Sequence, residues 1–366
     1  MMKLPGIKVF LLLPVAFALM ANLPAQPLNQ ETKNLFNNLK SLAPSQVLFG
    51  HQDDLAYGVQ WKKERHRSDI KDVCGDYPAV FGWEIGHIGQ SPFSLDTVWF
   101  KDLRHWIREA YKMGGVNTIS WHLDNPCTGG SAWDNTDCIA DILPGGSKHE
   151  MYLQQLEAVA DFLGTLTTGL FSKQLIPIIF RPFHEHSGDW FWWGKGHTTP
   201  EDYKALYRFT VNYLRQVRGL DNVLICYSPD VIADEAAYLE FYPGDNFVDL
   251  MGLDDYHDVG NPRRAGDLTK RLRLVVELAE SRGKIPVLSE TGLNMIPEPD
   301  WWTNVLWKAI ADDPVASRIA YLMVWRNART NHHFGPFRGH PSADDFVRFV
   351  NDPRVLTVSE LPKIYR

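Results

Sequence analysis

The chain has 366 residues, of which 45% are hydrophobic and 22% charged, and its formal net charge is -7. This composition is ordinary for a globular protein, and the net negative charge gives no indication of a basic surface of the kind that binds nucleic acid. The 13 Trp are unusually many, and exposed indoles suit ligands with flat apolar faces such as sugar rings, with additional core Trp as the alternative.

The N-terminus has the pattern of a secretory signal peptide. Two Lys precede the apolar run 9–20, and small residues including Ala25 follow it. The run is shorter than the roughly 20 apolar residues of a membrane span. We therefore expect a signal peptide over 1–25, a mature chain over 26–366, export to the periplasm or the cell exterior, and no membrane span.

Eight short apolar runs rich in β-branched residues alternate with helical patterns along the rest of the chain. The predicted strands are 47–51, 79–84, 116–122, 175–180, 222–227, 247–253, 285–289 and 319–325. The predicted helices are 97–113, 150–166, 200–217, 269–282 and 300–312, and Pro200 opens the third of these after a Thr cap at 198 or 199. Eight strand–helix units predict a single (β/α)8 TIM barrel. An open doubly wound sheet is disfavoured because no Gly-rich phosphate loop follows the first strand.

The four cysteines divide into a candidate pair and two single thiols. Cys127 and Cys138 lie in the Gly-, Asp- and Asn-rich segment 126–146, which we expect to form a long loop after the third strand. In an exported protein this pair could close a short loop as a disulfide. Cys226 lies in an apolar run and is expected to be a buried free thiol, while Cys74 has no assignment.

Ionisable and aromatic side chains follow every predicted strand except the fifth, at the end where barrels carry their chemistry. Glu185 follows the fourth strand and Glu290 the seventh, so both belong to the same face of the barrel. Carboxyl pairs about 5–5.5 Å apart cleave glycosides with retention, and pairs about 6.5–9.5 Å apart with inversion. A structural ion pair is the alternative for either glutamate taken alone. We expect Glu185 to be the general acid/base, because its aromatic neighbours favour the protonated form, and Glu290 to be the nucleophile.

Seven segments of the chain match the pattern of one enzyme family. The most specific is Arg-Pro-Phe-His-Glu-His-Ser-Gly-Asp-Trp-Phe-Trp-Trp-Gly over 181–194. The shorter ones are 49–58, 75–83, 120–122, 255–256, 288–292 and 324–326. Together they resemble glycoside hydrolase family 26, whose best-known members are β-mannanases, and they extend from about residue 46 to 327, most of the mature chain.

The resemblance implies a mannan endo-1,4-β-mannosidase. Such an enzyme hydrolyses internal β-1,4-mannosidic bonds of mannan, galactomannan or manno-oligosaccharides with retention, here with Glu185 as acid/base and Glu290 as nucleophile. The resemblance implies no cofactor and no metal. The expected partner is the glycan substrate, and we expect the protein to be a monomer.

The resemblance also implies roles for residues around the two glutamates. His184 is expected to orient the nucleophile and the substrate, and Tyr256 to hydrogen-bond the nucleophile. Trp190 matches an aromatic platform near the leaving-group sugar. On the non-reducing side, the implied contacts are the platform Trp325 and the polar residues His122 and Arg326.

Three alternatives to this interpretation stay open at the level of sequence. The same family contains xylanases and mixed-linkage β-glucanases. The alternating pair His184 and His186 could bind a metal, although metal-dependent barrels usually place such a pair on the first strand. A non-catalytic glycan-binding barrel is disfavoured because both glutamates are present. We further hypothesise that the loop between Cys127 and Cys138, with its Trp133, limits the sugars bound on the non-reducing side and favours mannobiose as product.

Overall fold

The structure is a computed structural model, and it describes residues 27–169, 173–260 and 265–366. The predicted signal peptide over 1–25 lies outside the described residues. Within the described ranges, none of the helices combines the length and the apolar character of a membrane-spanning segment.

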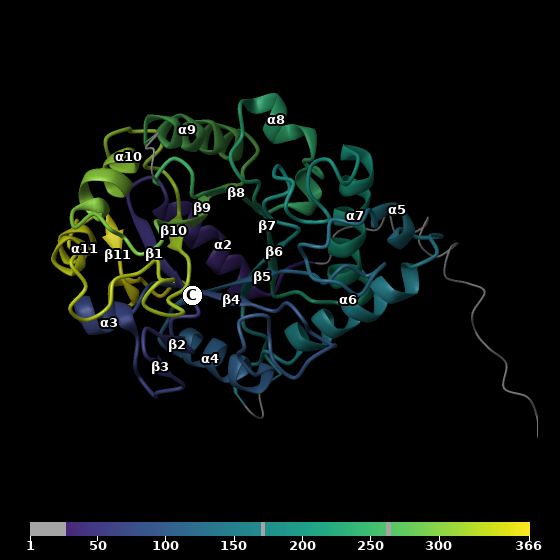
Figure 1. Ribbon diagram of the computed structural model, residues 1–366, viewed down its shortest axis with the longest axis horizontal. Coiled ribbons are helices and arrows are strands. Elements are labelled where there is room, and N and C mark those ends of the chain that lie inside the picture. The colour runs from purple at the N-terminus through teal and green to yellow at the C-terminus, as the bar shows by residue number, and fades with distance from the viewer. Residues whose placement is uncertain (1–26, 170–172, 261–264) are drawn as a thin grey trace, which may run out of the picture.

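Eight parallel strands in the described part of the chain close into a barrel, seen as a ring of strands in Figure 1. The closure is the pairing of the last strand with the first. The strands are β1 (Val47–Gln52), β4 (Val80–Glu84), β5 (Val116–Trp121), β6 (Ile178–Pro182), β7 (Val223–Tyr227), β8 (Leu250–Asp255), β9 (Ile285–Thr291) and β10 (Tyr321–Val324). The predicted (β/α)8 barrel is thus confirmed, with each predicted strand present and its ends shifted by a few residues.

The helices surround this ring (Figure 1), and all five predicted helical segments are present. They are α4 (Phe100–Lys112), α6 (His149–Gly164), α7 (Pro200–Asn212) with its π-helical continuation η1 (Tyr213–Val217), α9 (Ala265–Ser281), and the π-helical η3 (Trp302–Trp307) with α10 (Lys308–Ala311). The Thr cap of α7 is Thr199, whose side chain accepts a hydrogen bond from the backbone N–H of Asp202. A Pro follows this cap because the first helical N–H needs no intrahelical partner.

The remaining elements were not predicted from the sequence. They are the helices α2 (Gln30–Leu42), α3 (Asp69–Cys74), α5 (Ile139–Ile142), α8 (Glu235–Glu240) and α11 (Ala343–Val350), the short 3-10 turns η2 (Asp245–Phe247) and η4 (Val358–Glu360), the hairpin of β2 (Tyr57–Gly58) and β3 (Trp61–Lys62), and β11 (Val355–Leu356), which pairs with β1.

Helix α2 closes the end of the barrel at which the strands begin. Its Leu35 and Leu39 are fully buried in one apolar cluster with residues from the barrel strands, and the penultimate residue Tyr365 joins that cluster. The Tyr365 hydroxyl donates to the carbonyl of Gly115 at 2.6 Å, so the C-terminal tail is docked on the barrel. With this end filled, the carboxyl ends of the strands remain for a functional site.

Candidate active site

Glu290 is the last residue but one of β9, rather than following the strand as predicted. It is 3% exposed, and its carboxylate accepts hydrogen bonds from the Tyr256 hydroxyl at 2.8 Å and from the guanidinium of Arg181. Arg181 comes from β6, and its guanidinium also contacts Asp254 at 3.0 Å. Burial opposes the charge on Arg181, but Asp254 and Glu290 outweigh it and raise its pKa well above the usual range. A permanent positive charge and a hydroxyl donor therefore stabilise a negative charge on Glu290.

A β-bulge in β9 sets the direction of Glu290. Leu288 pairs with Leu253 of β8 and with Leu322 of β10, but the next pairs are Glu290 with Asp254 and Thr291 with Val324. Strand β9 thus carries one extra residue relative to both neighbours. Alternation in a regular strand would send successive side chains to opposite faces. At the bulge, both Ser289 and Glu290 reach groups in the barrel interior, the former donating to Asp254 at 2.6 Å.

Two carboxyls share the single guanidinium of Arg181. Burial raises the pKa of Asp254 to about 8, because the attraction of Arg181 does not compensate for lost water and the charge of Glu290 adds repulsion. The pKa of Asp254 is therefore raised even though both of its carboxyl oxygens accept hydrogen bonds from the Arg181 guanidinium.

Glu185 lies on a tightly bent segment that follows β6. Phe183 and Glu185 have φ angles of 51° and 54°, a left-handed conformation that is uncommon for residues other than Gly. Hydrogen bonds to the backbone hold this bend, from the Tyr203 hydroxyl to the Phe183 carbonyl at 2.9 Å and from the Glu185 N–H to the Ser228 carbonyl at 2.8 Å. The bend is thus fixed by its neighbours, as strained backbone at functional sites usually is.

The surroundings of the Glu185 carboxyl favour its protonated form. Burial raises its pKa well above the usual range, and the negative charges of Glu290 and Asp254 add to the effect. The indole N–H of Trp190 donates to Oε2 of Glu185 at 2.8 Å and opposes the rise. The site therefore combines a carboxyl held protonated with a second carboxyl held next to a fixed cation.

His184 and His122 form one corner of the site, with ring centroids 4.6 Å apart. His184 is buried, and its Nδ1 has no hydrogen-bond partner among the described residues. Burial, and then the neighbouring cations, lower the pKa of His184 well below its usual value, so this imidazole is neutral. The Nδ1 of His122 lies 2.7 Å from Oε2 of Glu84, whose charge outweighs burial and raises the pKa of His122.

The two histidines of the predicted metal alternative face different neighbours. His186 lies between the hydroxyls of Tyr203 at 3.1 Å and Tyr227 at 2.9 Å, and burial lowers its pKa to about 3. His184 instead packs against His122. In the described ranges, no cluster of three or more His, Cys, Asp or Glu side chains has the arrangement of a metal site.

Trp325 and Arg326 follow β10 on the His122 side of the site. The Trp325 ring meets His122 edge-on, with centroids 6.2 Å apart. Nη1 of Arg326 contacts Asp96 at 2.8 Å and donates to the Tyr57 hydroxyl at 3.2 Å. The guanidinium is thereby held in place while a quarter of the Arg326 side chain, 25%, stays exposed.

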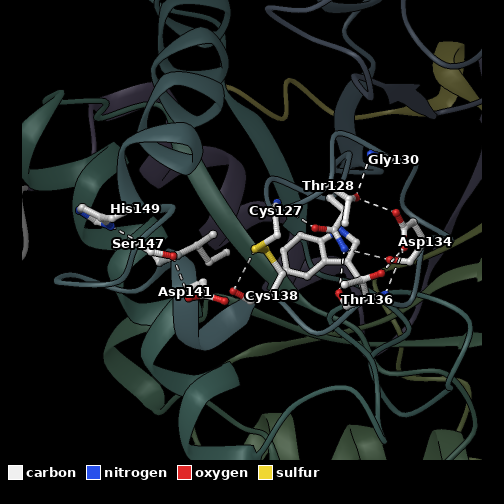
Figure 2. The surroundings of a disulfide bond; sticks show 12 residues. Cys127, Thr128, Gly130, Asp134, Thr136, Cys138, Asp141, Ser147 and His149 are labelled. Carbon is white, nitrogen blue, oxygen red and sulfur yellow. Dashed lines mark hydrogen bonds between the residues drawn. A yellow bond between two sulfur atoms is a disulfide. The ribbon is translucent and has the colours of Figure 1, made fainter.

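The long loop after β5 is closed by a disulfide between Cys127 and Cys138, shown in Figure 2. Within this loop Trp133 is 48% exposed and stacks on His122, with ring centroids 5.3 Å apart and planes 17° from parallel. The ring of Phe191, from the segment after Glu185, also packs on Trp133 at 5.4 Å. The loop therefore brings an exposed indole to the edge of the site.

The structure joins most of the predicted site residues through direct contacts and adds four that sequence reasoning did not assign. The additional residues are Glu84, Asp96, Arg181 and Asp254. Arg181 gave a usable signal, since a charged residue at the end of an apolar strand needs a buried partner. No sequence signal indicated Asp96, because it lies in an irregular loop.

Known proteins resemble this chain in sequence. The family model described as glycosyl hydrolase family 26 matches residues 25–325. A mannan endo-1,4-β-mannosidase of Bifidobacterium adolescentis is 32% identical over 358 residues, which cover 90% of this chain but only 35% of that protein. A mannan endo-1,4-β-mannosidase of Bacillus subtilis is 30% identical over 267 residues, which cover 68% of this chain and 71% of that protein.

Solved structures resemble this chain over most of its length. A GH26 β-mannanase from Bacteroides ovatus superposes with a TM-score of 0.88 at 42% sequence identity, covering 92% of this chain and 98% of that one. A modular endo-β-1,4-mannanase from Cellulomonas fimi superposes with a TM-score of 0.85 at 36% sequence identity, covering 93% of this chain and 78% of that one.

Replacing Glu185 by Gln should stabilise the protein at pH 7 and have little effect at pH 4. The folded protein keeps a proton on Glu185 that the unfolded chain releases above the ordinary glutamate pKa of about 4.3. The wild-type residue therefore lowers the free energy of unfolding increasingly as the pH rises through the interval between these two pKa values. A tenfold change in ionisation constant corresponds to about 1.4 kcal/mol.

Urea unfolding of wild type and Glu185→Gln at both pH values measures this difference. The matched control is Glu201→Gln, since the Glu201 side chain is 79% exposed on α7. A stability gain that is equal at pH 4 and pH 7 would contradict the raised pKa.

Proposed function

Because this chain belongs to glycosyl hydrolase family 26, we propose that it is a retaining endo-acting β-mannanase. Its substrates would be the internal β-1,4-mannosidic bonds of mannan, galactomannan or manno-oligosaccharides, as the names of its relatives suggest. The observation that supports the mechanism is the contrast between the two glutamates. Glu185 is held protonated by burial and by nearby negative charge, while Glu290 lies against Arg181 and Tyr256.

In the first step we propose that a carboxylate oxygen of Glu290 attacks the anomeric carbon. The bond from that carbon to the glycosidic oxygen breaks, and Glu185 transfers its proton to the leaving oxygen. Tyr256 and Arg181 would orient the attacking carboxylate through the hydrogen bonds described above.

In the second step a water molecule hydrolyses the glycosyl ester. Once Glu290 is esterified it carries no charge, so one cause of the raised pKa of Glu185 is removed. The ionised Glu185 then accepts a proton from the water that attacks the anomeric carbon. The sugar leaves with its original anomeric configuration, and both glutamates return to their starting states.

The substrate contacts are assigned by the same reasoning. Trp190 would contact the leaving-group sugar beside Glu185, to which it is hydrogen-bonded. His122, Trp325 and Arg326 would contact sugars on the non-reducing side, and the neutral His184 would donate or accept a hydrogen bond at the centre of the site.

We also propose that the protein is exported and acts as a monomer. The N-terminal pattern of residues 1–25 and the disulfide between Cys127 and Cys138 support export, because disulfides persist in oxidising compartments. Mass spectrometry of the N-terminus of protein recovered outside the cytoplasm tests this, and a chain that retains residues 1–25 would contradict it.

A substrate panel tests the proposed activity. The protein should release manno-oligosaccharides from mannan and galactomannan, and much less product from xylan or mixed-linkage β-glucan. Proton NMR of the first products should show the β-anomer, because double displacement retains configuration. Activity confined to xylan or glucan would overturn the substrate, and an initial α-anomer would overturn the retaining mechanism.

The two glutamates should respond differently to substitution. Glu290→Ala should lower turnover of every substrate by at least a factor of about 10⁴, since it removes the nucleophile. Substrate binding should remain intact. Glu185→Ala should reduce mannan hydrolysis by a factor of about 10²–10⁴ but spare formation of the glycosyl–enzyme from aryl mannosides with good leaving groups, which need no proton.

Kinetics on mannan and on an activated aryl mannoside separate the two roles. Glu201→Ala, on the exposed surface of α7, is the matched control and should keep full activity. Equal losses on both substrates in Glu185→Ala would refute its assignment as the acid.

We also propose that the disulfide-closed loop limits binding on the non-reducing side and biases products toward mannobiose. Trp133 stacks on His122 at that side and is half exposed. Shortening the loop and, separately, Trp133→Ala should lengthen the products from mannohexaose, as resolved by chromatography. An unchanged product pattern in both variants would contradict this proposal.

A further inference from the structure

The disulfide-closed loop, residues 127–138, also contacts the segment that carries the acid/base glutamate. The side-chain amide of Asn135 donates to the carbonyl oxygen of Asp189 at 2.9 Å. The N–H of Trp192 donates to the carbonyl of Ala132 at 3.2 Å. Two segments more than 50 residues apart in the chain are thereby joined directly beside Glu185.

The Asp189 carbonyl receives a second hydrogen-bond contact, from Nε2 of His197 at 2.9 Å. The other ring nitrogen of His197 faces the carboxylate of Asp137, on the same disulfide-closed loop, at 3.8 Å. The peptide group between Asp189 and Trp190 is therefore anchored from this loop both directly and through His197.

Trp190 transmits this anchoring to the acid/base. Its indole N–H donates to Glu185, and its ring lies directly over Gly188. A Cβ atom at position 188 would come within 2.2 Å of the ring, so a side chain there would displace the indole. The position of Trp190 thus depends on the bare backbone of Gly188 on one side and on the fixed Asp189 carbonyl on the other.

The loop itself is rigid enough to act as an anchor. The disulfide closes it, and the Asn125 side chain donates to the carbonyls of Asp134 at 2.9 Å and Thr136 at 2.8 Å across its interior. The Asp134 carboxylate accepts from the hydroxyls of Thr128 and Thr136, as Figure 2 shows. These bonds span the loop from one half to the other.

We propose that Asn135, carried on the disulfide-closed loop, is a positioning residue for the acid/base Glu185 and acts through the Asp189 carbonyl and Trp190. This inference rests on the proposed function, since it concerns the proton donor of that reaction. It adds a role for the loop that is separate from any limit on the sugars bound at the non-reducing side.

The test compares Asn135→Asp and Asn135→Ala with wild type. The Asp variant keeps the shape of the side chain but cannot donate to a carbonyl. Both variants should lower kcat/KM for mannopentaose by about fivefold, the effect of losing one hydrogen bond, with less than a twofold change for an aryl mannoside with a good leaving group. The alkaline limb of the pH profile should move to higher pH, because the Trp190 donor favours the carboxylate form of Glu185.

Two further variants make the test independent of the Asn135 site. Gly188→Ala should reproduce the same substrate ratio and pH shift by displacing the indole. Reduction of the Cys127–Cys138 disulfide should move wild type in the same direction and leave the double variant Cys127→Ser/Cys138→Ser unaffected by the reductant. Asn351→Ala, an exposed residue after α11, is the matched control and should behave as wild type.

The outcomes separate this inference from the proposed function. If wild type is inactive on all mannans, the proposed function fails. If wild type is active but Asn135→Asp, Asn135→Ala and Gly188→Ala fold and keep the wild-type substrate ratio and alkaline limb, the positioning role is overturned. Thermal unfolding of each variant establishes that it is folded.

Discussion

The catalytic end of this barrel depends on the buried guanidinium of Arg181. A buried cation without partners is costly, and Arg181 meets two carboxyls, those of Asp254 and Glu290. One cation cannot neutralise two buried anions, and burial together with the charge of Glu290 raises the pKa of Asp254 to about 8. Removing Glu290 would remove one cause of the raised pKa of Asp254. The three residues, from β6, β8 and β9, therefore form one electrostatic unit that also links these three strands.

This unit acts on Glu185 through space. Burial raises the pKa of Glu185, and the negative charge of Glu290 raises it further. The hydrogen bond from the Trp190 indole to the Glu185 carboxyl lowers this pKa in part. The two glutamates thus stand in opposite electrostatic surroundings, because Arg181 lies beside Glu290 whereas Glu185 is close to negative charge. The left-handed bend that carries Glu185 and the bulge that carries Glu290 are the backbone features that permit this arrangement.

The barrel and the position of both glutamates at the carboxyl end of its strands could be predicted from the sequence, because these features leave local signals. Strand–helix alternation gave all eight barrel strands, and the motif around Glu185 is long and specific. Sequence reasoning did not find the partners of Arg181 or the hydrogen bond from Asn135 to Asp189, because each joins residues far apart in the chain. It placed Glu290 after its strand because a bulge extends β9 without changing the apolar pattern. Helix α2 was missed because its apolar face is narrow, although it fills the barrel end.

The bulge in β9 has a consequence for protein design. A strand without it would present either the residue at 289 or the residue at 290 to the barrel interior, but not both. On a regular eight-stranded scaffold whose strand keeps residue 289 inward, a grafted glutamate at position 290 would therefore face the surrounding helices. A transplanted site must include the extra residue in this one strand, and the scaffold must accept the shifted pairing on both sides of it.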